Sequence, residues 1–333
     1  MPATRQQTTT LRSISQALGV STATVSWVLS GQGDAKGISA ATQKRVRDFA
    51  AETRYRPNMV ARGLSLGSTK TIGLLISSLA DPFYSSIAKS VVEEAGRLGY
   101  STMISTSQSD GSKEKEMAAL LGSRQVDGII VTPTEQADWV NSYISAGGKI
   151  VLVDRPVPGS DAPNVVIDNR ESAFRLVSHL IREGHRRIAI FTTAHNLVNM
   201  QARHEGYIQA LEEAGIEPDE RLFCKVPPEA SIDQIHAEID RLISECPDVD
   251  GIFFTTHVLV LPTYAHYLKA GLPLDQGKHW ACIHTLPDFE LLIPKMSIAR
   301  MPIENMGICA VDMLLGRGEL GNNVLRCQLE LKQ

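Results

Sequence analysis

A short helix with one apolar face is predicted by the stretch Ser21-Thr22-Ala23-Thr24-Val25-Ser26-Trp27-Val28-Leu29. Ser21 is a favourable N-cap, and Val25, Val28 and Leu29 recur at helical spacing on one side. Small polar residues occupy much of the remaining surface. We therefore expect this helix to pack through its aliphatic stripe and to leave the other face exposed.

Two further helices are predicted on either side of this stretch. A helical pattern beginning at Leu11 stops at Gly19-Val20, and Ser39 can cap a third helix that buries Val46 and Phe49-Ala50. The segment Gly31–Gly37 is rich in turn-forming residues. Three short helices with a tight turn between the first two are typical of a helix-turn-helix domain.

The charge of the chain is unevenly distributed along its length. The first 70 residues contain ten Lys and Arg residues against three acids, a net charge of +7. The remaining residues contain 23 basic and 34 acidic side chains, a net charge of −11. A small basic head on an acidic body indicates a polyanion-binding module joined to another domain. The alternative is an uneven surface without functional meaning.

The second helix has side chains suited to reading DNA. In a helix-turn-helix, the N-terminal part of this helix meets base edges in the major groove, which here places Thr22 and Ala23 at the bases. Both can contact a thymine methyl group, and Ser21 and Ser26 would lie near phosphates. Trp27 lies off the buried stripe, so it either packs on the groove floor or covers a neighbouring part of the loop 31–37.

A second candidate DNA element follows the third helix. Pro57 suits the start of a helix, whereas Gly63 weakens a helix interior by about 1 kcal/mol relative to alanine. A short segment of this kind folds readily only when docked. Leu64 is then a candidate apolar wedge in the minor groove. An interdomain linker with a buried leucine is the alternative.

The chain changes to alternating strands and helices after Thr71. Buried strands are predicted at 72–76, 101–104, 128–131, 149–153, 187–191, 251–254 and 279–283, with helices near 84–98, 113–123 and 137–146. This repeated alternation predicts an α/β body of two doubly wound parallel sheets with a cleft between two lobes. Ligands in such sheets bind at the carboxyl ends of the strands.

Several other classes of protein lack support in the sequence. The five cysteines are widely spaced without metal-ligand patterns, and no phosphate-binding or dinucleotide-binding glycine motif is present, so we expect no metal, no cofactor and no enzyme. Residues 1–10 carry no apolar leader, and no apolar run reaches the length of a membrane span. We expect a cytoplasmic, nucleoid-associated protein with no membrane partner.

Specific motifs resemble the LacI/GalR family over essentially the whole chain. The matching segments are Gly19-Val20-Ser21-Thr22-Ala23-Thr24-Val25-Ser26, Tyr55-Arg56-Pro57-Asn58, Thr71-Ile72-Gly73-Leu74-Leu75, Asp81-Pro82-Phe83-Tyr84, Val126-Asp127-Gly128-Ile129-Ile130, Val153-Asp154-Arg155-Pro156 and Gly184-His185-Arg186-Arg187-Ile188-Ala189. The resemblance implies a dimeric transcription factor, usually a repressor, with a hinge helix and a periplasmic-binding-protein-like effector domain. The implied domains are a disordered arm (1–10), a helix-turn-helix (11–56), a hinge helix and linker (57–70) and an effector-binding and dimerisation domain (71–333).

The resemblance also assigns DNA contacts by position. Tyr55 and Asn58 would hold the backbone and hinge, and Ala61 and Leu64 would enter the minor groove. Trp27 departs from the family, which commonly has an arginine there that reads guanine. The expected DNA contacts are Thr10, Leu11, Ser21, Thr22, Ala23, Ser26, Trp27, Ser30, Tyr55, Asn58, Ala61 and Leu64.

Effector contacts follow from the same resemblance. The expected residues are Ser77, Asp81, Phe83, Tyr84, Thr132, Asp154, Arg203, His257 and His284. Carboxylates and arginine can bind sugar hydroxyls, and aromatic rings can stack on the apolar face of a sugar. Arg203 is the strongest candidate because the family spacing to Gly206 is preserved; a surface salt bridge is its alternative.

Two histidines depart from the family in the second lobe. His257 and His284 stand where many members have acidic residues. One hypothesis is an effector more acidic than a neutral sugar, such as a sugar acid or a phosphorylated sugar, with pH-dependent binding because histidine titrates near neutrality. A degenerate cleft, or one that binds by packing alone, is the alternative.

The sequence as a whole predicts a ligand-controlled regulator that binds a palindromic operator in double-stranded DNA as a homodimer. The effector would be a sugar or sugar derivative. A solute-binding protein without DNA function is the main alternative, and a sugar-metabolising enzyme is the third interpretation.

Overall fold

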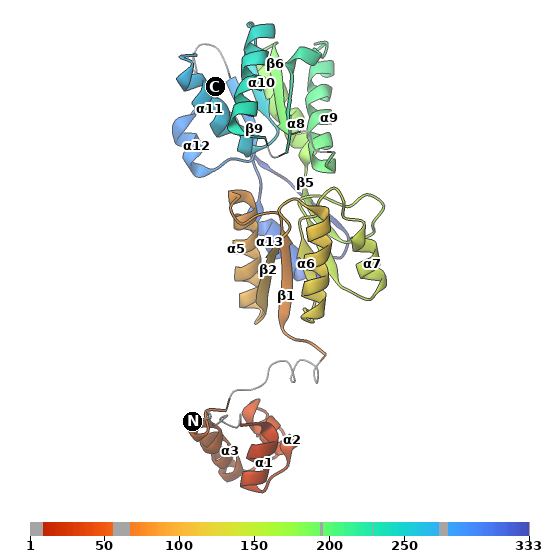
Figure 1. The fold of residues 1–333 in the computed structure, drawn as a ribbon, viewed down its shortest axis with the longest axis vertical. Coiled ribbons are helices and arrows are strands. Elements are labelled where there is room, and N and C mark those ends of the chain that lie inside the picture. The colour runs from red at the N-terminus through yellow and green to blue at the C-terminus, as the bar shows by residue number, and fades with distance from the viewer. Residues whose placement is uncertain (1–8, 56–66, 194–195, 229, 273–278, 333) are drawn as a thin grey trace, which may run out of the picture. The chain divides into compact units, whose positions relative to one another are not determined.

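The computed structural model describes residues 9–55, 67–193, 196–228, 230–272 and 279–332 (Figure 1). The chain divides into two compact units, Met1–Thr69 and Lys70–Gln333. We call them the head and the effector unit. Within the described ranges, every helix is too short or too polar to cross a membrane.

The head contains three helices, α1 (Leu11–Leu18), α2 (Thr22–Leu29) and α3 (Ala40–Glu52). Gly19 ends α1 in the left-handed conformation, with φ of 65°, which glycine adopts without strain. The Ser21 and Ser39 hydroxyls cap α2 and α3 by accepting hydrogen bonds from Thr24 N and Thr42 N. The predicted caps and the helix-turn-helix are therefore present.

A small apolar core holds these helices together. Its buried members are Ile14, Val25, Val28, Val46 and Ala50, contributed by all three helices. Five buried aliphatic side chains are a small core. Side-chain hydrogen bonds, such as those that Gln43 donates to Asp34 and to the Ile38 carbonyl, therefore also help to hold the head in its conformation.

Two six-stranded sheets form the effector unit. The first has the order β11-β5-β4-β3-β1-β2, and we call the half that contains it the N-lobe. Its strands are β1 (Thr71–Ile76), β2 (Ser101–Thr106), β3 (Ile129–Val131), β4 (Ile150–Val153), β5 (Asn164–Ile167) and β11 (Asn322–Leu325). Its helices are α5 (Pro82–Arg97), α6 (Gly111–Ser123), α7 (Trp139–Ser145) and α13 (Ile303–Leu314).

The second sheet repeats this arrangement with the order β12-β10-β9-β8-β6-β7, and we call its half the C-lobe. Its strands are β6 (Ile188–Thr193), β7 (Phe223–Val226), β8 (Gly251–Phe254), β9 (His279–Ile283), β10 (Ser297–Arg300) and β12 (Gln328–Glu330). Its helices are α8 (Asn169–Arg182), α9 (Val198–Glu213), α10 (Ile232–Glu245), α11 (Val260–Lys269) and α12 (Pro287–Leu292), with short 3-10 turns at Glu220–Leu222 and His257–Leu259. Neighbouring strands run parallel, except that β12 is antiparallel to β10.

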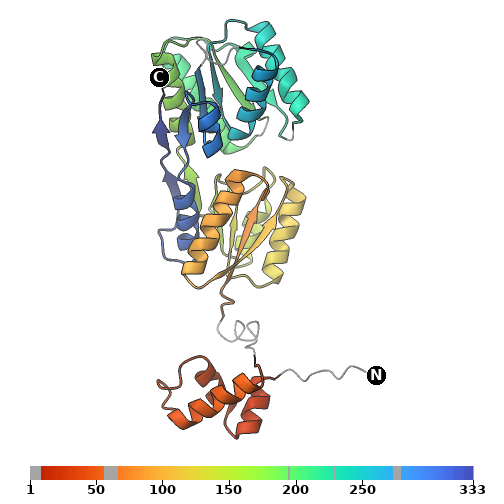
Figure 2. The same cartoon turned by 90° about the vertical axis from the view of Figure 1, so that its left-hand side faces the viewer.

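The chain passes between the lobes after β5, after β10 and after β11, along one side of the effector unit (Figure 2). Asp168 ties two of these connections together, because its Oδ1 accepts from Cys327 N at 2.9 Å and from the Ser172 hydroxyl at 2.9 Å. The connections therefore share a hydrogen-bonded joint.

A close helix pair supports each lobe. In the C-lobe α9 packs on α8, and a Cβ added to Gly206 would lie 2.2 Å from the Arg170 carbonyl oxygen. In the N-lobe α13 packs on α5, and a Cβ on Gly307 would lie 2.2 Å from Ser90 Oγ. Glycine therefore permits the close approach in both lobes.

The seven predicted strands are all present, and five more were missed. Those are β5, β7, β10, β11 and β12, which have only three or four residues each. The predicted strands β3, β4 and β8 are equally short but contain no polar side chain, whereas each missed strand contains at least one, which weakens the apolar signal in the sequence.

Candidate functional site

The exposed face of α2 contains the predicted base-reading residues. Thr22, Ala23, Ser26 and Trp27 are exposed, as is Ser30 at the end of the helix. The helix has no charged side chain along its length. Any reading by α2 must therefore use hydroxyl, methyl and aromatic groups.

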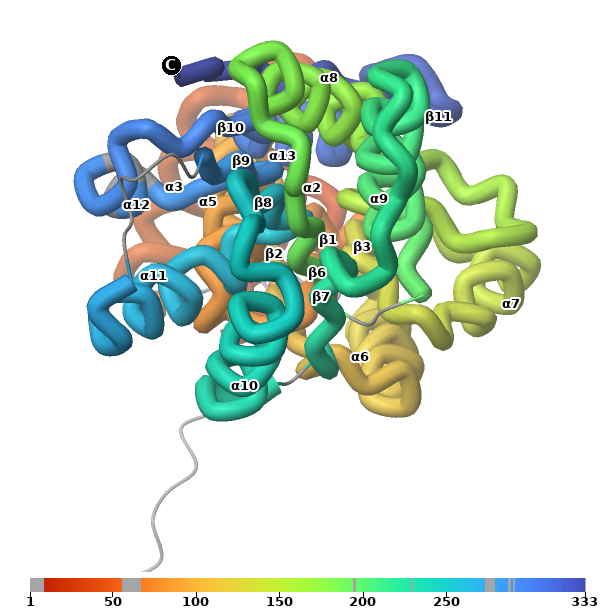
Figure 3. Tube along the Cα trace, turned by 90° about the horizontal axis from the view of Figure 1, so that it is seen from above, coloured from red at the N-terminus to blue at the C-terminus, as the bar shows by residue number. Residues whose placement is uncertain are grey.

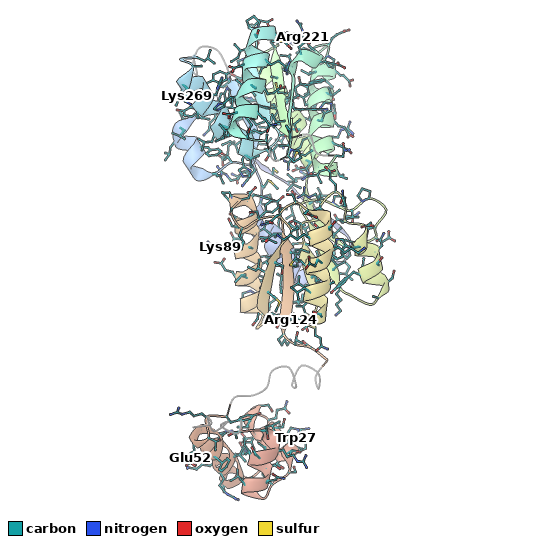
Figure 4. All side chains as sticks on the ribbon, viewed as in Figure 1. Trp27, Glu52, Lys89, Arg124, Arg221 and Lys269 are labelled. Carbon is teal, nitrogen blue, oxygen red and sulfur yellow. The ribbon has the colours of Figure 1, made fainter. Side chains whose placement is uncertain are left out.

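Trp27 is exposed at the surface of the head, where Figure 4 labels it. Lys36 Nζ lies 5.3 Å from the centre of the Trp27 ring, a cation–π distance. Gln43 fixes the same loop, because its Nε2 donates to Asp34 Oδ1 and to the Ile38 carbonyl, each at 2.8 Å. The loop alternative for Trp27 is thus observed, although 37% of the side chain stays exposed.

Three predicted DNA contacts also have structural roles in the head. The Thr10 hydroxyl forms a capping box with Ser13 at the start of α1. Leu11 and Tyr55 are half-buried against the apolar core, and burial raises the pKa of the Tyr55 hydroxyl. Only part of each side chain is therefore available for DNA.

The other DNA predictions concern the hinge and the charge of the head. Asn58, Ala61 and Leu64 lie outside the described residues and stay predictions. Exposed basic side chains in the described part of the head are Arg12, Lys36, Lys44, Arg45, Arg47 and Arg54. They supply the positive charge that a phosphate backbone attracts.

Two adjoining cavities lie between the lobes of the effector unit, of about 180 and 790 Å³. They share Ser77, Tyr84, Ser109, Arg155, Leu197 and Pro228. We call them together the cleft. All nine predicted effector residues line it: Ser77, Asp81, Phe83, Tyr84, Asp154, Arg203, His257 and His284 in the smaller cavity, and Thr132 in the larger.

Asp154 and His284 occupy equivalent corners of the two lobes. Each follows the third strand of its sheet, β4 or β9, and each has a positive φ, of 76° and 63°. Their N–H groups donate to the carbonyls of Val165 and Ala299 in the next strand, at 3.0 and 2.8 Å. Non-glycine residues held in this conformation are uncommon and cluster at functional sites.

Each corner touches a helix of the opposite lobe, α9 for Asp154 and α5 for His284; these helices follow β6 and β1. Asn199 on α9 donates to Asp154 Oδ2 at 3.1 Å, while the rings of Phe83 on α5 and His284 meet edge to face at 5.7 Å. The N-lobe corner is thus bridged by a hydrogen bond and the C-lobe corner by an aromatic contact.

A third bridge joins Asp81 at the start of α5 to His257 in the C-lobe. His257 Nε2 lies 3.5 Å from Asp81 Oδ1, and Asp81 Oδ1 also accepts from Phe83 N at 2.8 Å. Burial alone would raise the pKa of Asp81, but His257 and the Phe83 N–H lower it, and the net shift is downward. Asp81 is therefore a carboxylate at neutral pH.

Arg203 is a buried member of the cleft. Its Nε donates to Asn169 Oδ1 at 2.7 Å and its Nη1 to the Thr255 carbonyl at 2.6 Å. Burial lowers its pKa. The surface salt bridge considered from the sequence is therefore wrong.

Among the residues of the smaller cavity that the sequence did not predict are Arg155 and Asn199, which hydrogen-bond to predicted contacts. Arg155 is buried beside Asp154, and its Nη2 donates to the Tyr84 hydroxyl at 2.8 Å. A signal existed for both, since Arg155 adjoins Asp154 and Asn199 precedes Arg203 by one helical turn.

The expectation that both histidines titrate near neutrality is wrong for His284. Burial first, then the nearby His257, Arg203 and Arg300, lower its pKa from 6.5 to about 3. His284 is therefore a neutral imidazole in the cleft at neutral pH.

Two family models match the chain. The model described as "Bacterial regulatory proteins, lacI family" matches residues 10–58, and that described as "Periplasmic binding proteins and sugar binding domain of LacI family" matches residues 69–279. Together they cover the helix-turn-helix and most of the effector unit.

Characterised relatives are regulators of the same kind. The transcriptional regulator RegA of Clostridium saccharobutylicum is 34% identical over 217 residues, spanning 65% of this chain and 64% of that protein. KdgR of Bacillus subtilis is 26% identical over 93% of this chain and 91% of its own. The ribose operon repressor of Halalkalibacterium halodurans is 26% identical over 92% of this chain and 90% of its own.

Solved structures share the fold. The lac repressor dimer bound to operator and an anti-inducer matches with a TM-score of 0.83 at 23% identity, covering 98% of each chain. The regulator CelR in complex with cellobiose matches with a TM-score of 0.71 at 26% identity, covering 97% of this chain and 99% of CelR. The chain therefore belongs to the LacI family and is a DNA-binding transcriptional regulator rather than an enzyme.

Proposed function

We propose that this regulator is a repressor that binds a palindromic operator as a homodimer and responds to a small sugar-type effector in its cleft. The observation that carries the proposal is the exposed, uncharged face of α2 on a head whose other exposed side chains are rich in Lys and Arg. Such a division suits a helix that meets bases while its surroundings bind phosphates.

The chemistry of α2 favours contacts with thymine methyl groups. Thr22 and Ala23 supply a hydroxyl and two methyl groups, and Trp27 adds a broad apolar surface one turn further on. An arginine reading guanine is absent from this helix. We therefore propose A·T-rich half-sites, with most of the affinity coming from the basic side chains and falling steeply with salt.

Exposed apolar side chains in both lobes of the effector unit support a homodimer. They are Val92, Met103 and Ile104 in the N-lobe and Val258, Leu261, Leu268, Leu291 and Leu292 in the C-lobe. Helices α5, α11 and α12, which carry several of them, lie on one side of the effector unit (Figure 3). Exposed apolar side chains in both lobes suit a second copy of the chain, because a two-fold interface uses the same surface on each partner. Two heads would then meet two half-sites related by the same symmetry.

The polar lining of the cleft supports control by a sugar-type ligand. CelR binds cellobiose, and another structural relative, from Alkaliphilus metalliredigens, was solved with D-xylulofuranose. The cleft offers carboxylates, guanidinium groups and aromatic rings that suit a polyol. Its bridges join the two lobes, so a ligand that changes them would change lobe closure and bias the proposed hinge at 57–70.

Selection of bound DNA from a random pool tests the proposal. We expect recovery of A·T-rich sequences with two-fold symmetry by the full chain, and weaker recovery at higher salt. The variant Trp27→Ala should relax sequence preference within each half-site, while Arg54→Gln should weaken the binding of all sequences to the same extent. If no sequence-specific DNA is recovered, with or without added sugars, the proposed function is wrong.

A further inference from the structure

Three buried nitrogen atoms in the cleft lack a hydrogen-bond partner within the described parts of the chain. They are Arg155 Nε, His257 Nε2 and His284 Nδ1, and all three residues line the smaller cavity. His257 Nε2 approaches Asp81 Oδ1 only to 3.5 Å. Buried polar atoms are normally paired, so three unpaired ones around one cavity offer a ligand three positions for a hydrogen bond.

The acidic groups of this cavity are already engaged. Asp154 accepts from Asn199 and lies 3.4 Å from Arg155 Nη2, while Asp81 accepts from the Phe83 N–H. Among the described residues that line the cavity, the buried side-chain atoms left unpaired are all nitrogens. Arg155 Nε can only donate, and each imidazole ring can present one N–H, so all three atoms can meet an acceptor on a ligand.

We propose that the cleft recognises an anionic group on its ligand, a carboxylate or a phosphate, through His284, His257 and Arg155. This inference rests on the proposed function and narrows its effector class from sugars in general to acidic sugar derivatives. Asp81 and Asp154, held by protein donors, remain beside the anionic group and can accept from the hydroxyls of the same ligand. The smaller cavity, about 180 Å³, holds the anionic end, and the adjoining one has room for the rest.

His284 and its acidic replacement give opposite expectations. A neutral imidazole can donate a hydrogen bond to an anion, whereas an aspartate at the same corner would repel it. Aspartate also tolerates the positive φ of this position, so His284→Asp is a matched change of chemistry on an unchanged backbone. We expect the change to weaken anion binding by about tenfold or more.

The test is an NMR titration of the full chain with histidine rings isotopically labelled. Inorganic phosphate is exchanged for chloride at constant ionic strength and neutral pH. We expect saturable shifts of the His257 and His284 signals, assigned with His257→Asn and His284→Asn. His236 and His266, which pair with each other on α10 and α11 away from the cleft, serve as internal references.

Two outcomes would overturn the proposal. One is the absence of a saturable shift at His257 and His284 with phosphate. The other is an equal shift in His284→Asp, provided that circular dichroism shows the variant folded. If His257, His284 and Arg155 bind the same anion, His257→Asn should also weaken the phosphate-dependent shift of the His284 signal.

A comparison of acidic sugars with a neutral sugar then shows whether the anionic group of the ligand is a carboxylate or a phosphate. D-glucuronate and D-glucose 6-phosphate are compared with D-glucose by calorimetry, and tighter binding of either acid than of glucose identifies the source. Equal affinity for all three would also contradict the inference. DNA selection is measured separately, so a failed anion titration leaves the operator-binding proposal standing, and a failed selection leaves the anion result standing.

Discussion

Asp154 in the N-lobe and His284 in the C-lobe share one backbone corner but differ in chemistry. Both follow the third strand of a sheet of the same order, both have a positive φ, and both bond to the neighbouring strand through the main chain. Asp154 is a carboxylate satisfied by Asn199, whereas His284 packs on Phe83 and keeps an unpaired Nδ1.

The difference separates what the fold fixes from what the side chain decides. The corner conformation follows from the repeated topology, because in both lobes the chain must leave one strand and bond to the next strand in the same way. The hydrogen-bonding character of each corner depends on the residue placed there and on the helix of the opposite lobe that meets it. The lobes are thus alike in geometry and unlike in the ligand atoms they can hold.

The largest expected effect concerns the helix pairs that support the two lobes. In Gly206→Ala the new Cβ would lie 2.2 Å from the Arg170 carbonyl oxygen, and two packed backbones cannot separate cheaply. We expect a loss of about 3 kcal/mol in the free energy of unfolding. In Gly307→Ala the new Cβ would lie 2.2 Å from Ser90 Oγ and 2.6 Å from Ser90 Cβ. Rotating the Ser90 hydroxyl would break its hydrogen bond to the Glu304 carbonyl and leave the second contact, so about 2 kcal/mol is expected.

Gly96→Ala is the control for these two variants. Nothing lies within 4 Å of a Cβ at this position near the end of α5, so alanine should stabilise the helix by about 0.5 kcal/mol. Thermal midpoints at one fixed protein concentration compare all three, since the proposed dimerisation would couple to stability. A Gly206→Ala chain as stable as the wild type would show that the two helices are not closely packed.

A smaller effect is expected from changing the bridge at the N-lobe corner. Asn199→Asp would place a second carboxylate 3.1 Å from Asp154 Oδ2, and the two like charges should push the lobes apart. Asn199→Ala adds no charge and removes the hydrogen bonds to Asp154 and from Met200 N, which should cost about 1 kcal/mol. Hydrogen exchange at both lobe edges of the cleft is the measurement. Faster exchange in Asn199→Asp than in Asn199→Ala at the same neutral pH is the expected pattern.

If Asn199→Asp and Asn199→Ala exchange alike at neutral pH, the lobes are not held by this bridge. The C-lobe corner would then be the more important contact, through the ring of Phe83. Phe83→Leu, which keeps an apolar side chain but removes the edge-to-face contact with His284, would test that alternative.

Local patterns predicted the helices of the head and seven of the twelve strands described in the two sheets. Ser21, Ser39 and Gly19 signalled their helix ends through chemistry that needs no distant partner. In contrast, β11 and β12 are separated by only two residues yet join different sheets, and no periodicity in three or four residues encodes that choice. The pairing follows from the three connections between the lobes.

The lining of the cleft could be predicted by position, but its hydrogen bonding could not. All nine expected effector residues line the cleft, while their binding of a ligand stays a prediction. Arg155 and Asn199 were missed because each acquires its role from a partner far away in the chain, Tyr84 and Asp154. The protonation of His284 was also misjudged, since it depends on burial that a linear pattern does not express.

The smallest effect at neutral pH should come from replacing the histidine at the C-lobe corner. His284 has a pKa of about 3 in the folded chain, against an ordinary value of 6.5. Between about pH 3 and pH 6.5 the ring is therefore protonated in the unfolded chain and neutral in the folded chain. Stability is therefore unaffected above pH 6.5 and is lost progressively as pH falls from 6.5 towards 3. His284→Asn removes this proton and tolerates the positive φ, so its unfolding midpoint should fall less steeply between pH 7 and about pH 4. Parallel curves for wild type and variant would mean that His284 is not held neutral, and the contrast with Asp154 would then be one of shape alone.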